Sequence, residues 1–266
     1  LTRRFNENGA YTLKMDIFIV DAFTDQQFKG NSAAVIPVED WLSDDLMQNI
    51  AAENNLSETA YIKRIGVNQY KIRWFSPLTE IDFCGHATLA SAFVLFTELG
   101  LQSQVEFITR KVGSLKIVLN AENEIEMIFP NQKPEVVLTA PEPIQVLKNR
   151  QAYFAVFGCE QDVLEVTYVS EELKQLAPLD VVVTSTSERY DFISRYFWPA
   201  NGGDEDPVTG SIHSGLAPYW ADSLGKSDLV AYQASKRGGV LKCSVSEEAV
   251  VICGKAVLYL KGKVYV

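Results

Sequence analysis

Two segments of the chain each combine an acidic turn, a glycine beside a small polar residue, and an apolar run long enough for a helix. The first runs from Ile81 to Phe96 and the second from Asp204 to Trp220. A helix that is apolar all round is normally buried, and small residues let it fit inside a narrow sheet. Its N-terminus offers free N–H groups and positive partial charge. The sequence therefore predicts two buried helices whose N-termini can bind a carboxylate.

Strand patterns surround both helices. Before the first, Ser43 followed by Asp44 and Asp45 predicts a capped helix over residues 44–54. The first apolar helix is expected from about Gly85 to Leu99, and the second from about Thr209 to Leu224. In the second half we also expect a helix near residues 143–147 and a strand over residues 163–169. The pattern predicts an α+β fold with two pseudo-symmetric halves, each a curved sheet or barrel around a central apolar helix.

The expected domain boundaries follow the prolines and the two helices. Residues 1–14 are interpreted as an N-terminal extension, residues 15–130 as the first half and residues 131–255 as the second half. Four prolines between Pro130 and Pro143 mark the passage from one half to the other. The C-terminal strand, residues 256–266, is expected to complete the first half.

The composition excludes several classes of protein. A net charge of -10 without a basic stripe argues against nucleic acid and anionic membrane surfaces. No apolar run approaches the roughly 20 residues of a membrane span, and residues 1–14 lack the apolar core of a signal peptide. The 4 cysteines form no C-x-x-C pair, and the 2 histidines cannot build a His-rich metal site. We therefore expect no metal site and a reduced, cytoplasmic protein.

Six short motifs occur in an order that is informative about the family. They are residues 20–24 (VDAFT), 30–35 (GNSAAV), 55–60 (NLSETA), 73–77 (RWFSP), 84–88 (CGHAT) and 205–211 (EDPVTGS). Together they resemble the PhzF family of phenazine-biosynthesis-like isomerases, which shares its fold with diaminopimelate epimerase and proline racemase. The resemblance implies a site in the cleft between two halves, a small carboxylated substrate, no cofactor, and a homodimer.

The resemblance also implies roles for individual residues. Glu58 is the expected general acid/base. Three further residues are expected to line the site and to position substrate or shuttle protons: His86, Asp206 and Ser211. Backbone N–H groups of Gly85 and Gly210 would face a substrate carboxylate. The remaining expected substrate-binding residues are Asn31, Ser57 and Thr209.

Each of these residues also has an ordinary structural interpretation. A glutamate between a helix and a strand, such as Glu58, commonly caps the helix or faces water. In a closed site, loss of hydration makes a carboxylate a stronger base, able to take a proton from one carbon and return it to another. His86 begins a helix, where imidazolium is disfavoured, so a neutral imidazole is expected. Glu205 is expected to be structural or to face outward.

Three alternatives bear on the chemistry. A racemase or epimerase with two opposed thiols would use Cys84, but the second turn, at Asp206 to Thr209, carries no cysteine. Cys84 is therefore interpreted as a small packing residue. Ser214 lies inside an expected helix, which excludes the strand–turn–helix of a hydrolase nucleophile. The favoured function is cofactor-independent movement of a proton between carbons of a small carboxylated substrate; a racemase and a non-catalytic binding protein remain as alternatives.

Overall fold

The computed structural model describes residues 4–5, 11–139 and 143–266 of the chain. Residues 1–3 and 6–10 of the expected extension therefore lie outside the described residues. The chain divides into two compact units. Unit 1 comprises residues 1–28, 32–127 and 255–266, and unit 2 comprises residues 29–31 and 128–254.

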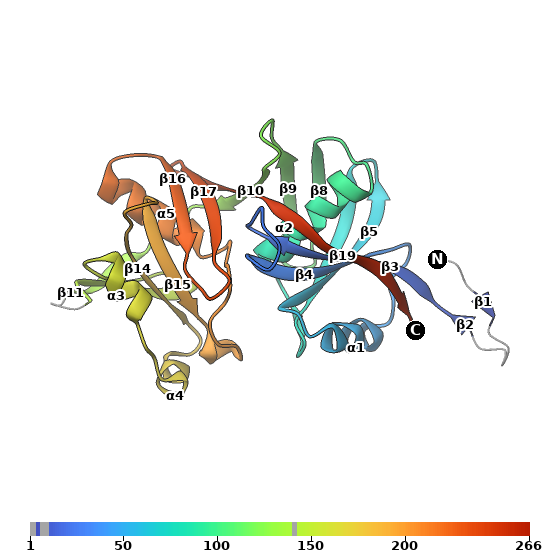
Figure 1. Ribbon diagram of the computed structural model, residues 1–266, viewed down its shortest axis with the longest axis horizontal. Coiled ribbons are helices and arrows are strands. Elements are labelled where there is room, and N and C mark those ends of the chain that lie inside the picture. The colour runs from blue at the N-terminus through green and yellow to red at the C-terminus, as the bar shows by residue number, and fades with distance from the viewer. Residues whose placement is uncertain (1–3, 6–10, 140–142) are drawn as a thin grey trace. The chain divides into compact units, whose positions relative to one another are not determined.

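Unit 1 is built on a strongly curved sheet, in which the C-terminal strand pairs antiparallel with an early strand (Figure 1). In order across the sheet its strands are β19 (Ala256–Tyr265), β3 (Lys14–Ala22), β4 (Asn31–Val38), β5 (Glu58–Gly66), β6 (Gln69–Phe75), β8 (Gln104–Ile108), β9 (Ser114–Leu119) and β10 (Ile125–Pro130). The short β7 (Glu80–Ile81) pairs with β6, and β1 (Arg4–Phe5) pairs with β2 (Tyr11–Thr12).

Helix α1 (Asp44–Asn54) has the bounds that the sequence predicts. The Ser43 hydroxyl accepts a hydrogen bond from the N–H of Leu46 at 3.3 Å, as a helix cap does. The helix packs Met47, Ile50 and Ala51 onto one face of the sheet. Its position between β4 and β5 lets these two strands run parallel.

Helix α2 (Gly85–Phe93) is the first apolar helix, and every residue from Gly85 to Ala92 is buried. It lies against β3, β5 and β19. A π-helical turn, η1 (Val94–Glu98), continues it to the predicted end, and Gly100 follows with φ +74°. Burial on all sides is the expected consequence of its composition.

Unit 2 repeats the same plan with other strands. Across the sheet these are β11 (Glu135–Thr139), β12 (Gln145–Lys148), β13 (Ala152–Val156), β14 (Asp180–Thr186), β15 (Phe192–Phe197), β16 (Asp228–Gln233), β17 (Gly239–Val245) and β18 (Ala249–Gly254). Its helices are α3 (Glu160–Glu165), α4 (Ser170–Leu173), η2 (Lys174–Leu176), η3 (Pro199–Asn201) and α5 (His213–Leu224).

The two units share one order of strand pairing. In unit 1, β4 and β5 are parallel across α1, and β6 and β8 are parallel across α2. In unit 2, β13 and β14 are parallel across α3 and α4, and β15 and β16 are parallel across α5. The hairpin pairs within each unit, such as β5 with β6 and β14 with β15, are antiparallel. This repetition confirms the predicted α+β fold of two similar halves, each with one central apolar helix.

Three local predictions are wrong. Residues 143–147, expected as a helix, belong mainly to β12, because hydrogen bonds to β11 and β13 on both sides stabilise a strand there. The expected strand at 163–169 is partly helix α3, which begins with acidic residues Glu160 and Asp162. The second apolar helix begins at His213 instead of Thr209, because residues 209–212 form a turn.

Helix α5 carries a proline in its interior, which would leave one carbonyl without its helical partner. Pro218 has no N–H for the carbonyl of Ser214. The N–H of Gln132 donates to that carbonyl at 3.0 Å. The proline is therefore tolerated because a residue outside the helix supplies the missing donor.

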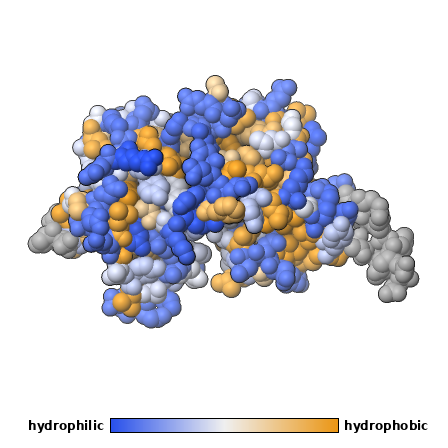
Figure 2. Space-filling model, viewed as in Figure 1, coloured by the Kyte–Doolittle hydropathy of each residue, from blue (hydrophilic) through white to orange (hydrophobic). Residues whose placement is uncertain are grey.

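Hydrophilic residues are spread over the displayed faces of both units (Figure 2). Among the described residues, no helix combines the length and the apolar character that a membrane crossing requires.

Gly215 is expected to be essential for the packing of α5. A Cβ at this position would lie 2.8 Å from Cζ of Phe154 and 2.8 Å from Nδ2 of Asn149. Gly215→Ala should therefore lower the free energy of unfolding by about 1–3 kcal/mol, although alanine is the better helix former. Urea unfolding measures the change. Gly158→Ala is the control, because nothing lies within 4 Å of the added carbon; equal effects of both variants would contradict the expectation.

Candidate functional site

Glu58 is the first residue of β5 and is buried, with 7% of its surface exposed. Helix α1 ends at Asn54, four residues before it, and Asn55 adopts the left-handed conformation that reverses the chain. The Asn54 side chain then donates to the Thr59 hydroxyl at 3.0 Å, which ties the end of the helix to the start of the strand. These contacts fix the backbone that carries the carboxylate, and they place the partly buried Ser57 beside it.

Cys84 and His86 lie at the N-terminus of α2, on either side of Gly85. Cys84 is the cap residue in extended conformation, and its carbonyl accepts hydrogen bonds from the N–H and the hydroxyl of Thr88, at 3.1 and 2.6 Å. The Cys84 sulfur is 3.4 Å from Nδ1 of His86. Nε2 of His86 is 2.7 Å from Oε2 of Glu58. The fold thus brings Glu58, Cys84 and His86 into one buried group, the Glu58 cluster.

The electrostatics of the Glu58 cluster favour an imidazolium–carboxylate pair. Burial lowers the pKa of His86, but its interactions with the neighbouring Cys84 and Glu58 side chains outweigh burial and raise this pKa above its ordinary value. The neutral imidazole expected from the helix N-terminus is therefore wrong, because a carboxylate at 2.7 Å has the stronger effect.

Cys84 is a neutral thiol at physiological pH. Burial, followed by the charge of Glu58, raises its pKa to about 11. Because the thiolate is the form that takes a proton, this thiol is a poor base. The structure thus argues against the racemase alternative in its two-thiol form.

One oxygen of Glu58 has no straight hydrogen bond. Oε2 is buried and lies 2.7 Å from Nε2 of His86, at an ion-pair distance without the geometry of a hydrogen bond. A buried carboxylate oxygen in this state has a lone pair available for a proton.

In unit 2, Asp206 is the centre of a second group, the Asp206 cluster. Its Oδ1 accepts from the Asn31 side-chain amide at 2.9 Å, and its Oδ2 accepts from the Thr209 hydroxyl. Asn31 also donates to the carbonyl of Val208 at 3.0 Å. Three residues predicted for the site are therefore in contact here, and both Asn31 and Thr209 hold the carboxylate of Asp206.

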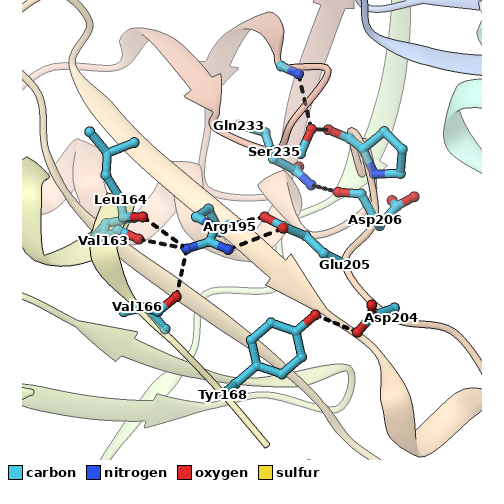
Figure 3. Close-up of polar contacts among 12 residues, drawn as sticks. Val163, Leu164, Val166, Tyr168, Arg195, Asp204, Glu205, Asp206, Gln233 and Ser235 are labelled. Atoms are coloured by element: carbon cyan, nitrogen blue, oxygen red, sulfur yellow. Dashed lines mark hydrogen bonds and ion pairs between the residues drawn. The ribbon is translucent and has the colours of Figure 1, made fainter. Parts of the chain in front are cut away.

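Gln233, at the end of β16, contacts the backbone of the same turn and was not predicted. Its side-chain amide donates to the carbonyl of Asp206 at 2.9 Å, and its oxygen accepts from the N–H of Thr209 at 2.9 Å. The residue is fully buried, and Figure 3 shows its amide directed at Asp206. No motif marks it, because its role depends on a strand remote in sequence.

Ser211 lies in the turn before α5, and its hydroxyl oxygen accepts from Gln151 at 3.0 Å. The same Gln151 amide donates to the Tyr196 hydroxyl at 3.3 Å, and that hydroxyl donates to Asp180. Since Gln151 supplies the hydrogen in its bond to Ser211, the hydrogen of the Ser211 hydroxyl can be donated to another group. Gly210 is buried in this turn, where its carbonyl accepts from the N–H of His213 at 3.1 Å.

Glu205 is a structural residue, as predicted. Its carboxylate accepts two hydrogen bonds from the Arg195 guanidinium, at 2.7 and 3.1 Å (Figure 3). The third nitrogen of Arg195 donates to carbonyls at the end of α3, including that of Val166 at 2.9 Å. Tyr168 donates to Asp204 beside it. These contacts hold the acidic turn in place. Of its acidic residues, Asp206 is the one that contacts Asn31 and Thr209.

The family described as phenazine biosynthesis-like protein matches this chain over residues 20–152 and 147–262. An uncharacterized isomerase of Pseudomonas aeruginosa is 43% identical over 261 residues, covering 95% of this chain and 100% of that protein. A human phenazine biosynthesis-like domain-containing protein is 35% identical and covers 94% of this chain and 99% of its own length.

Solved structures agree with these sequence relationships. A PhzF-family crystal structure from Enterococcus faecalis superposes with a TM-score of 0.90 at 41% identity, covering 96% of this chain and 100% of that one. A hydroxyproline epimerase from Agrobacterium vitis shares the fold at a TM-score of 0.59 and 10% identity, covering 95% of this chain and 93% of that one.

The fold and the relatives define an enzyme of the isomerase class with a diaminopimelate epimerase-like architecture. The chain belongs to the PhzF family of phenazine biosynthesis-like proteins. The family predicted from the sequence motifs is thereby confirmed.

His213, the first residue of α5, should make folding sensitive to acid. It is fully buried, and burial lowers its pKa to about 4, while Nδ1 lies 2.8 Å from the Thr209 carbonyl. On acidification the unfolded chain gains the proton first, near its ordinary pKa of about 6.5. The contribution of neutral His213 to the free energy of unfolding is therefore complete above that pH, and it is lost as the pH falls toward about 4.

Compared with His213→Asn, which keeps a donor for the Thr209 carbonyl, the wild type should lose about 2 kcal/mol of stability between pH 7 and about pH 5. Urea unfolding of both proteins at each pH measures the difference. A parallel pH dependence of the two proteins would show that His213 is not the group responsible.

Proposed function

We propose that this protein is a cofactor-independent isomerase that moves a proton between carbons of a small carboxylated substrate, with Glu58 as the general acid/base. The observation that carries the proposal is the 2.7 Å contact between the buried carboxylate of Glu58 and the imidazole of His86. A buried carboxylate that holds and returns a proton is the minimum that this reaction requires.

The reaction has a simple proton and electron balance. Glu58 takes a proton from a carbon made acidic by conjugation with the carboxylate, and the electron pair of that C–H bond enters the conjugated system. The double bond shifts, and the proton returns to another carbon of the same molecule. His86, as the charged partner of Glu58, stabilises the carboxylate before it takes the proton and can exchange that proton with it.

The Asp206 cluster and Ser211 are assigned to substrate binding. The Ser211 hydroxyl, with Gln151 as its donor, has a hydrogen to offer a carboxylate or a developing negative charge. Asp206, held by Asn31 and Thr209, is an acceptor for a hydroxyl or amino group of the substrate. Gly85, Gly210 and Ser57 retain their predicted role as neighbours of the substrate, and the homodimer stays a prediction.

Glu58→Gln should abolish proton transfer. The amide keeps the size and shape of the side chain and cannot accept a proton at neutral pH, so we expect a loss of about a hundredfold or more in rate. The measurement is NMR in D₂O, which follows deuterium into carbon positions of candidate acids. The panel contains unsaturated and cyclic carboxylic acids, among them methylitaconate and trans-4-hydroxy-L-proline, together with common amino acids.

Glu124→Gln is the matched control for this test, because Glu124 is also buried in unit 1 and is outside the Glu58 cluster. It should retain deuterium exchange. Undiminished exchange in Glu58→Gln would remove Glu58 from the mechanism. Exchange in which one carbon only is labelled, with inversion of configuration, would favour the racemase or epimerase alternative.

Ser211→Ala should weaken substrate binding. One hydrogen bond to a charged group contributes about 1.5–3 kcal/mol, so KM should rise roughly tenfold to a hundredfold. Steady-state kinetics on the acid that shows exchange tests this expectation. Ser223→Ala removes an exposed α5 hydroxyl that donates to the Tyr219 carbonyl, and KM should stay as in the wild type. A KM for Ser211→Ala equal to that of the wild type would argue against Ser211 as a substrate-binding residue.

The two remaining alternatives have distinct outcomes. Survival of exchange in Cys84→Ala would contradict a thiol-based racemase. Thermal stabilisation by an acid that shows no exchange at any carbon would favour a binding protein over an enzyme.

A further inference from the structure

The three side chains of the Glu58 cluster also form a possible set of metal ligands. The carboxylate of Glu58, the thiol of Cys84 and a ring nitrogen of His86 all lie within 4.8 Å of one another. The sulfur is 3.9 Å from Nε2 of His86, and this nitrogen is 2.7 Å from Oε2 of Glu58. A buried set of one carboxylate, one thiol and one imidazole is the type of donor set that binds Zn²⁺.

We propose that Glu58, Cys84 and His86 form a binding site for a thiophilic divalent cation, with Zn²⁺ as the ion that fits best, and that this ion inhibits the enzyme. The site has three protein ligands and leaves a fourth position for water. Binding depends on these three side chains alone, whereas the inhibition rests on the proposed function of Glu58.

The geometry needs only small side-chain movements. Around a tetrahedral Zn²⁺ with ordinary bond lengths, neighbouring ligand atoms are about 3.3–3.6 Å apart. The sulfur–Nε2 separation of 3.9 Å is slightly longer than this, and the Nε2–Oε2 separation of 2.7 Å is shorter. A rotation of Glu58 would open its contact with His86, and a small rotation of Cys84 or His86 would shorten the sulfur–Nε2 separation toward tetrahedral spacing.

The charges also favour a dication. A thiolate and a carboxylate together carry two negative charges, which balance Zn²⁺, while a neutral imidazole adds none. The bound site is then neutral overall, so the burial of the ion leaves no uncompensated charge. Mg²⁺ and Ca²⁺ are excluded by the same set, because they require several oxygen ligands and this group offers one carboxylate.

The group is not fully sealed from solvent. Each of the three residues retains a small exposed surface, from 5% for His86 to 7% for Glu58. The bound ion would occupy the lone pairs of both Glu58 and His86, which are the groups that must move the proton. Zn²⁺ would therefore stop proton transfer without any change of fold.

Cobalt binding tests the site directly. The protein, freed of metal with a chelator that is then removed, is titrated with Co²⁺ and followed by absorption. We expect a thiolate-to-cobalt charge-transfer band that saturates at one ion per chain and disappears when Zn²⁺ is added. Cys84→Ser should abolish the band and weaken Zn²⁺ binding by about a hundredfold or more, and Glu58→Gln should weaken it at least tenfold.

Cys159→Ser is the matched control. Cys159 is an exposed thiol in unit 2 with Asp162 at 3.1 Å from its sulfur, and within the described part of the chain it belongs to no group of three donors. This variant should keep the band and the affinity of the wild type. Absence of the band in the wild type, or binding that Cys84→Ser leaves undiminished, would overturn the site.

The inhibition is tested on the deuterium exchange that the wild type catalyses. Saturating Zn²⁺ should suppress exchange, and a chelator should restore it; exchange that persists with the site filled would overturn the inhibitory role. A protein that binds Co²⁺ through Cys84 but shows no exchange with or without metal would instead contradict the proposed isomerase and leave the metal site supported. The two proposals therefore fail in different ways.

Discussion

A helix without charged side chains has to be surrounded by protein, and this requirement organises each unit. The first eight residues of α2, from Gly85 to Ala92, are all buried. A flat sheet covers only one side of a helix, so the sheet of unit 1 curves, and its first strands are joined by β19 from the end of the chain. The same requirement acts on α5 in unit 2. Because the N-terminus of α2 is enclosed, Cys84 and His86 are enclosed with it, and the strand that packs beside them supplies Glu58.

Burial of charge is the second constraint, and the two units satisfy it differently. The carboxylate of Glu58 lies 2.7 Å from an imidazole whose pKa is raised by its neighbours, so its partner is a group that can carry positive charge. The carboxylate of Asp206 is held by neutral donors, the amide of Asn31 and the hydroxyl of Thr209. A carboxylate paired with a group that can itself gain and lose a proton is suited to proton transfer, whereas one fixed by neutral donors is suited to binding. The division of roles in the proposed reaction follows from this difference.

Local signals in the sequence were sufficient where local energetics decide the structure. The bounds of α1 follow from a serine cap and acidic residues in the first turn, and the start of α2 follows from its composition. These local signals were insufficient where contacts with residues distant in the sequence decide the structure of a segment. The segment at residues 143–147, where a helix was expected, is mainly a strand because β11 and β13 lie on either side of it. Thr209 is hydrogen-bonded to Asp206 and Gln233 in a turn, so the second apolar helix begins only at His213.

The sequence by itself determined the family, the α+β class and the candidate residues Glu58, His86, Asp206 and Ser211, because these occur in contiguous motifs whose spacing is visible along the chain. Only the tertiary structure decided which of them touch. Gln151, Gln233 and Arg195 carry no motif, yet they position Ser211, Thr209 and Glu205. The contact of Glu58 with His86, and with it the three-donor set that includes Cys84, depends on a strand start packing beside a helix start. Such contacts form only when the whole sheet closes around the helix. The spacing of apolar residues along the sequence does not reveal them.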